Sequence, residues 1–107
     1  YTNIMAGTGF FDLTSAATTT LIAKESVAQG NIRTASICNQ HASNDIAVDL
    51  FYDDGLGNAD SDVYIIKNTV IPPGASLFLD NLSFDSFAQN LKITLVGSGL
   101  PVSVILK

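Results

Sequence analysis

One stretch of the chain, residues 46–52, has a two-residue period in which every second side chain is large and apolar. Ile46, Val48, Leu50 and Tyr52 fall on one face, and Ala47, Asp49 and Phe51 fall on the other. Successive side chains of a β-strand point to opposite faces, so a two-residue period predicts a strand with one buried face. The same alternation returns at Leu91, Ile93 and Leu95, which predicts a second strand of this kind.

Turn-forming segments divide the rest of the chain into short runs. The polar segment 41–45, the Pro-Pro-Gly of 72–74 and the Gly-Ser-Gly of 97–99 each interrupt an apolar or β-branched run. About seven strands at this spacing are typical of an antiparallel sandwich or barrel. The expected strands are residues 18–22, 31–39, 46–52, 63–70, 76–80, 91–95 and 101–107.

Two segments leave an alternative open. Residues 21–29 are closed by Gly30 and could form a short helix, although we favour a strand at their start. Residues 81–90 are irregular, with room for one helical turn around 84–89. We therefore expect an all-β, antiparallel β-sandwich, Ig-like or jelly-roll-like, over residues 18–107.

Residues 1–17 show no strict period, so we expect an extended N-terminal arm there. Two adjacent phenylalanines in this glycine-containing segment need burial, either on the chain's own core or on a neighbouring subunit. Neither a basic start nor an unbroken apolar run marks a signal peptide, and the sequence leaves open whether residues precede Tyr1. The candidate partner-binding residues of the arm are Tyr1, Ile4, Met5, Phe10, Phe11 and Leu13.

The charge content narrows the classes of partner. The 107 residues suit one domain, and only 14% of them are charged, with a net charge of −5. This balance argues against nucleic-acid binding, which needs clustered Lys and Arg. No apolar run reaches the ~18 residues of a membrane span. A thinly charged surface favours burial against other protein, and the alternative is an extracellular domain coated with Ser, Thr and Asn.

Few residues suggest chemistry. Cys38 is the only cysteine, so an internal disulfide is impossible, and we expect a buried thiol in a protein that assembles in a reducing cytoplasm. His41 is the only histidine, and its spacing from Cys38 places the two on opposite faces of a strand. We expect no enzyme activity and no cofactor.

An acidic loop spans residues 53–62. Its carboxylates and Asn58 offer oxygen ligands of the kind that Ca²⁺ prefers, but the spacing differs from an EF-hand and no Glu closes the loop. A solvated hairpin tip is the favoured interpretation, and calcium binding stays open. The aromatic residues outside the arm are expected to fill the core and not to form a sugar-binding platform: Phe51, Tyr52, Tyr64, Phe78, Phe84 and Phe87.

Several strings together resemble the small virion structural proteins of tailed bacteriophages. They are Thr-Leu-Ile at 20–22, Arg-Thr-Ala-Ser-Ile-Cys-Asn at 33–39, Ile-Ala-Val-Asp-Leu-Phe-Tyr-Asp at 46–53, the run from Tyr64 through Pro-Pro-Gly-Ala-Ser-Leu at 72–77, and Leu-Lys-Ile-Thr-Leu at 91–95. The resemblance covers residues 18–107 and carries no catalytic residues.

The resemblance implies a capsid decoration (cement) protein on the outer surface of the virion head. Its expected partners are major capsid protein subunits and further copies of itself, with a homotrimer as the expected oligomer. The alternatives are a phage neck, tail or fibre component and an extracellular carbohydrate-binding module.

Overall fold

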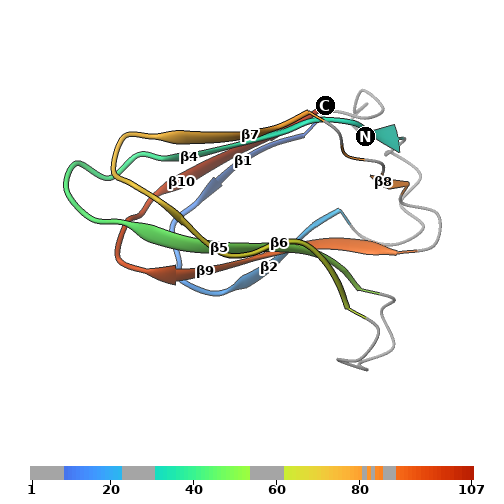
Figure 1. The fold of residues 1–107 in the computed structure, drawn as a ribbon, viewed down its shortest axis with the longest axis horizontal. Helices are drawn as coiled ribbons and strands as arrows, with labels where there is room; N and C mark the ends of the chain where they lie inside the picture. The colour runs from blue at the N-terminus through green and yellow to red at the C-terminus, as the bar shows by residue number, and fades with distance from the viewer. Residues whose placement is uncertain (1–8, 23–30, 54–61, 81, 83, 86–88) are drawn as a thin grey trace, which may run out of the picture.

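Two four-stranded antiparallel sheets pack face to face as a β-sandwich (Figure 1). The computed structural model describes residues 9–22, 31–53, 62–80, 82, 84–85 and 89–107. Sheet A has the order β1-β10-β4-β7, sheet B has the order β2-β9-β5-β6, and β3 pairs with β8 separately. The strands are β1 (Gly9–Leu13), β2 (Thr18–Ile22), β3 (Asn31–Ile32), β4 (Ala35–Asn39), β5 (Ile46–Asp53), β6 (Val63–Ile71), β7 (Ser76–Leu79), β8 (Phe84–Asp85), β9 (Asn90–Gly97) and β10 (Val102–Leu106). The expectation of an all-β antiparallel sandwich is confirmed.

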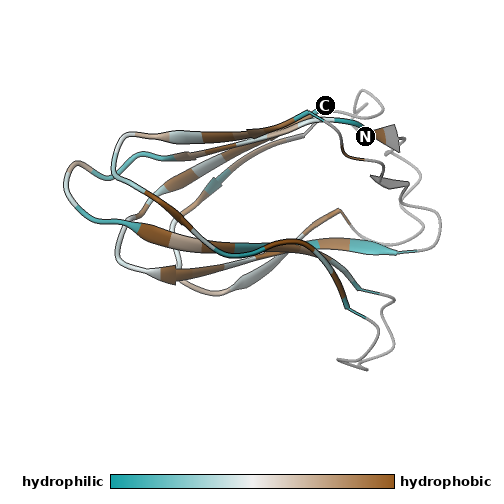
Figure 2. Ribbon diagram, viewed as in Figure 1, coloured by the Kyte–Doolittle hydropathy of each residue, from teal (hydrophilic) through white to brown (hydrophobic). Residues whose placement is uncertain are grey.

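The core lies between the sheets and is almost entirely aliphatic. Alternate residues of the central strands point inward, as the two-residue period predicts, and Figure 2 shows apolar residues recurring along these strands. β-Branched and leucine side chains suit this pleated, buried surface. The largest fully buried side chains are Ile32, Ile37, Ile46, Val48, Leu50, Leu91, Ile93, Leu95, Val102, Val104 and Leu106.

Most connections between strands cross from one sheet to the other. The links β1–β2, β4–β5, β6–β7 and β9–β10 each join sheet A to sheet B, whereas the link β5–β6 joins neighbours within one sheet. At the β6–β7 crossing, Ala75 N–H donates to the carbonyl of Pro72 at 3.1 Å, and Gly74 has φ of 76°. This geometry matches a type II turn, in which glycine tolerates the positive φ.

The N-terminal segment differs from the extended arm expected for residues 1–17. Gly9–Leu13 forms β1, which pairs along its whole length with β10, from Gly9 opposite Leu106 to Leu13 opposite Val102. Phe11 and Leu13 pack against the core. Part of the expected arm is therefore an edge strand of the sandwich, and residues 1–8 lie outside the described residues.

Two further details differ from the strands expected from the sequence. The predicted strand 31–39 is divided between β3 and β4, and Arg33 and Thr34 donate their N–H groups to the carbonyl of Lys107. In the irregular segment, Phe84–Asp85 forms β8 opposite β3, while residues 86–88 lie outside the described part. The helical alternative for 21–29 is wrong at its start, because Thr18–Ile22 is a strand; residues 23–30 are not described.

Candidate interaction face

The outer face of sheet A carries a row of side chains that crosses all four strands. The strand register places Phe10 opposite Ile105, Ile105 opposite Ser36, and Ser36 opposite Phe78. Phe10 is 68% exposed, Phe78 is 61% exposed and Ile105 is 37% exposed. We call Phe10, Ile105, Ser36 and Phe78 the apolar row.

A second row of polar side chains runs beside the apolar row. The register aligns Asp12, Ser103, Cys38 and Ser76 across the same four strands. Gln40 donates from Nε2 to Oδ1 of Asp12 at 3.4 Å and also hydrogen-bonds Oγ of Ser103. Asp12 is the only charged residue within the four strands of sheet A.

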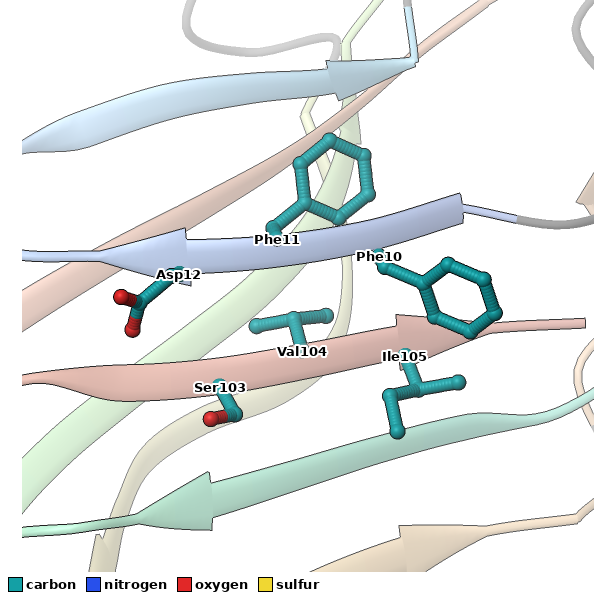
Figure 3. Close-up of a pocket in the computed structure, with 6 residues that line it drawn as sticks. All are labelled: Phe10, Phe11, Asp12, Ser103, Val104 and Ile105. Carbon is teal, nitrogen blue, oxygen red and sulfur yellow. The ribbon is translucent and has the colours of Figure 1, made fainter. Parts of the chain in front are cut away.

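A shallow hollow lies between β1 and β10 at one end of these rows. Figure 3 shows Phe10 and Ile105 side by side and Asp12 beside Ser103, while Phe11 points away from Phe10. The hollow is lined by Phe10, Phe11, Asp12, Ser103, Val104 and Ile105. Its walls are mostly apolar, so it suits a contact with an apolar side chain of another protein.

The outer face of sheet B has a different character. Lys92 Nζ lies 2.7 Å from Asp53 Oδ2, and Lys67 Nζ lies 4.6 Å from the centre of the Tyr64 ring. Phe51 stacks on Tyr64 with ring centroids 4.9 Å apart. Exposed Val70 and Val96 flank Ala47 on this face. Within the strands, sheet B therefore carries four charged residues and sheet A carries one.

The predicted partner-binding residues fall into three groups: exposed, packed against the core, and outside the described residues. Phe10 is exposed on the apolar row, whereas Phe11 and Leu13 are half-buried against the core. Tyr1, Ile4 and Met5 lie outside the described residues. The two alternatives for the adjacent phenylalanines were burial on the chain's own core or on a neighbouring subunit. Phe11 packs against its own core, and Phe10 is exposed and can contact another molecule.

Two exposed apolar members of the apolar row were not predicted from the sequence. Phe78 was expected in the core, but it is exposed, and Ile105 was not singled out. Tyr64, also expected in the core, is 40% exposed. A signal for Phe78 was present in the sequence, because the polar residues Ser76 and Asp80 lie two residues before and after it. The two-residue period therefore places Phe78 on the outer face, opposite to Leu77 and Leu79.

Cys38 and His41 have different surroundings in this fold. Cys38 is half-buried in the polar row, which corrects its expected burial in the core, because the buried positions of β4 are Ala35, Ile37 and Asn39. His41 accepts hydrogen bonds at Nδ1 from the N–H groups of Ser43 and Asn44, both at 3.0 Å. The histidine therefore organises the β4–β5 turn.

The remaining expectations concern metals and membranes. Asp53 is paired with Lys92, and residues 54–61 of the acidic loop, where calcium was considered, lie outside the described residues. Across the described residues, no three His, Cys, Asp or Glu side chains gather where they could hold a metal ion. No helix long and apolar enough to cross a membrane occurs in the same described residues.

A scan against protein-family models and a search of the curated proteins both found no match to this chain.

Proposed function

We propose that this protein is a structural component of a virus particle, bound through the outer face of sheet A to coat subunits. The particular role we propose is that of a capsid decoration protein on the outer surface of an assembled bacteriophage head. The observation that carries the proposal is the apolar row, which exposes two phenylalanines and an isoleucine on four strands that contain one charged residue.

Physical arguments support a binding role for this face. Exposed aromatic side chains that lie in one patch are enriched at protein interfaces, where they supply large contact areas at low entropic cost. Few charges need to be desolvated when such a face is covered. The resemblance of residues 18–107 to small tailed-phage virion proteins supports coat subunits as the partner.

The mechanism is stabilisation by many weak contacts. The strands of sheet A have only four or five residues each, so at ~3.3 Å per residue and ~4.8 Å between strands their face covers ~300 Å². A standard interface buries ~800 Å² per partner, so a single copy would bind weakly. Linking copies into an oligomer, such as the expected trimer, raises the overall avidity by orders of magnitude. The protein then holds neighbouring coat subunits together without any covalent chemistry.

Copy number per particle tests the proposed role. Purified particles of the bacteriophage that carries this sequence are analysed by quantitative mass spectrometry and by electron microscopy. Many symmetric copies on the head support decoration. A few copies at one vertex overturn decoration in favour of a neck or tail role, and absence from the particle overturns the virion role.

The face itself is tested by readdition to particles that lack the protein. Phe78→Ser removes an exposed ring from the apolar row, and we expect at least a ~tenfold loss of affinity for the particle. Val70→Ser on sheet B is the matched control, because Val70 is similarly exposed at 56%. Equal binding by both variants would contradict the assignment of the face. Glycan binding that requires Phe10 and Phe78 would instead favour a carbohydrate-binding module.

A further inference from the structure

The edge strands of the two sheets differ in the regularity of their pairing. In sheet B, the pairing of edge strand β2 with β9 shifts register between Thr20 and Ile22. The pairing of edge strand β6 with β5 shifts as well, at a site where Asn68 has φ of 52° and donates its N–H to Oδ1 of Asp49 at 2.6 Å. Such bulges, and the neighbouring Lys67, hinder the addition of another strand.

Neither edge strand of sheet A has a register shift or a lysine. β7 pairs with β4 without a register shift, and its four residues include no charge and no proline. β1 pairs with β10 without a register shift, and the carboxylate of Asp12, its single charge, already accepts a hydrogen bond from Gln40. Regular edges that carry one charge or none are templates for pairing with a further strand.

The directions of the two edge strands are complementary. Every neighbouring pair in the order β1-β10-β4-β7 is antiparallel, so β1 and β7 run in opposite directions. When two copies lie side by side, β7 of one copy therefore meets β1 of the next in an antiparallel orientation. We propose that copies of this protein associate edge to edge through β7 and β1, which extends sheet A from one subunit into the next.

The side chains on the two edges favour one register for this contact. With Phe78 opposite Phe10 of the next copy, Leu77 lies opposite Phe11 and Ser76 lies opposite Asp12. Leu77 and Phe11 are both half-buried and both pack against their own cores, so the junction joins two apolar inner faces. A slip by one residue would place inward side chains opposite outward ones. A slip by two residues would exchange the aromatic pair for Phe78 beside Asp12.

The contact uses different surfaces on its two sides, so it is a head-to-tail interface that closes into a ring when the rotation between copies permits. It also joins the apolar row of one subunit to that of the next at Phe78 and Phe10. The inference goes beyond the proposed virion role and does not depend on it, because it concerns the isolated protein.

Disulfide trapping tests the contact in purified protein. In a Cys38→Ser background, Phe10→Cys and Phe78→Cys are made in separate chains, which are then mixed and oxidised. Directly opposed residues of antiparallel strands have Cα atoms ~4.5–5.5 Å apart, which suits a disulfide. We expect a cross-linked dimer in the mixture and little in either variant alone.

The chain that carries both substitutions gives a second readout. Its two cysteines are three strand spacings apart, ~14 Å, which is too far for a bond within one chain. We expect a ladder of linked species or a closed ring on non-reducing gels. The matched control is Thr20→Cys with Tyr64→Cys, which occupy one row on the opposite edges of sheet B.

The outcomes separate clearly. Cross-linking of the sheet A pair that exceeds the sheet B control at least fivefold supports the contact. Equal yields from both pairs, no cross-linking of the sheet A pair, or cross-linking of Phe78→Cys alone at the yield of the mixture would each overturn it. A decoration role could fail in particle analysis while this contact is retained, and the reverse holds as well.

Discussion

The carboxamide of Asn39 donates a hydrogen bond to the carbonyl oxygen of Ile71 at 3.0 Å, and so joins the end of β4 in sheet A to the end of β6 in sheet B. The same Nδ2 donates to the carbonyl of Asn44 at 2.9 Å, and Oδ1 accepts from the N–H of His41. Asn39 is fully buried, and both its amide nitrogen and its amide oxygen are hydrogen-bonded. One side chain therefore holds two of the connections that cross between the sheets.

Replacement of Asn39 is expected to be costly. Asn39→Ala removes the partner of two carbonyl oxygens and one N–H, and we expect a loss of about 2–4 kcal/mol in the free energy of unfolding. Asn39→Asp is expected to be at least as severe, because a carboxylate oxygen would face carbonyl oxygens. Urea denaturation measures both variants. Asn44→Ala, which changes an exposed side chain, is the control and should lie within ~0.5 kcal/mol of the wild type.

Glycines at two turns are expected to differ in their tolerance of alanine. A Cβ at Gly99 would lie 2.5 Å from the carbonyl oxygen of Asn44 and 2.6 Å from that of Asp45, both of them backbone atoms. A Cβ at Gly74 would have nothing within 4 Å, so only its φ of 76° opposes substitution. We expect Gly74→Ala to cost ~1 kcal/mol and Gly99→Ala clearly more. Equal thermal midpoints would contradict this close contact between turns.

The membership of β1 in the sandwich is tested with its two phenylalanines. Phe11 is half-buried against the core, so we expect Phe11→Ala to lower the free energy of unfolding by about 1.5–3 kcal/mol. Phe10→Ala removes an exposed ring and should lie within ~0.5 kcal/mol of the wild type. Chemical denaturation of the two variants makes the comparison. Two equally mild losses would show that the segment acts as a detached arm.

The ion pair on sheet B is expected to contribute measurably to stability. Lys92 and Asp53 are mostly shielded, with side chains 25% and 12% exposed. In a double-mutant cycle of Lys92→Met and Asp53→Asn, we expect a coupling energy of ~1–2 kcal/mol. Lys67→Met, at an exposed lysine above Tyr64, is the comparison and should cost less than ~1 kcal/mol. A coupling energy near zero would contradict the shielded geometry.

The sequence predicts the central strands well because burial on one face leaves a visible period. β5 and β9 lie inside sheet B, and each alternates inward apolar residues with residues of the outer face. β1 could not be predicted in this way, since its adjacent phenylalanines share one character but point to opposite faces. Their separation depends on pairing with β10, which comes from the far end of the chain.

The candidate site was predictable only in part for the same reason. The low charge content indicated a surface suited to another protein, and Phe10 was among the expected contacts. Phe78 and Ile105 join Phe10 only through the strand order of sheet A, which no local pattern encodes. The hydrogen bonds of Asn39 could not be predicted either, because a polar residue at the end of a strand is usually interpreted as the start of a turn.

The position of β10 between β1 and β4 determines when these strands can pair during synthesis of the chain. Neither Gly9–Leu13 nor Ala35–Asn39 has its β10 neighbour until Val102–Leu106 has left the ribosome. A nascent chain that stops at Pro101 can still pair β4 with β7, but it leaves β1 without a neighbouring strand, so Phe11 and Leu13 have no place in sheet A until β10 is made.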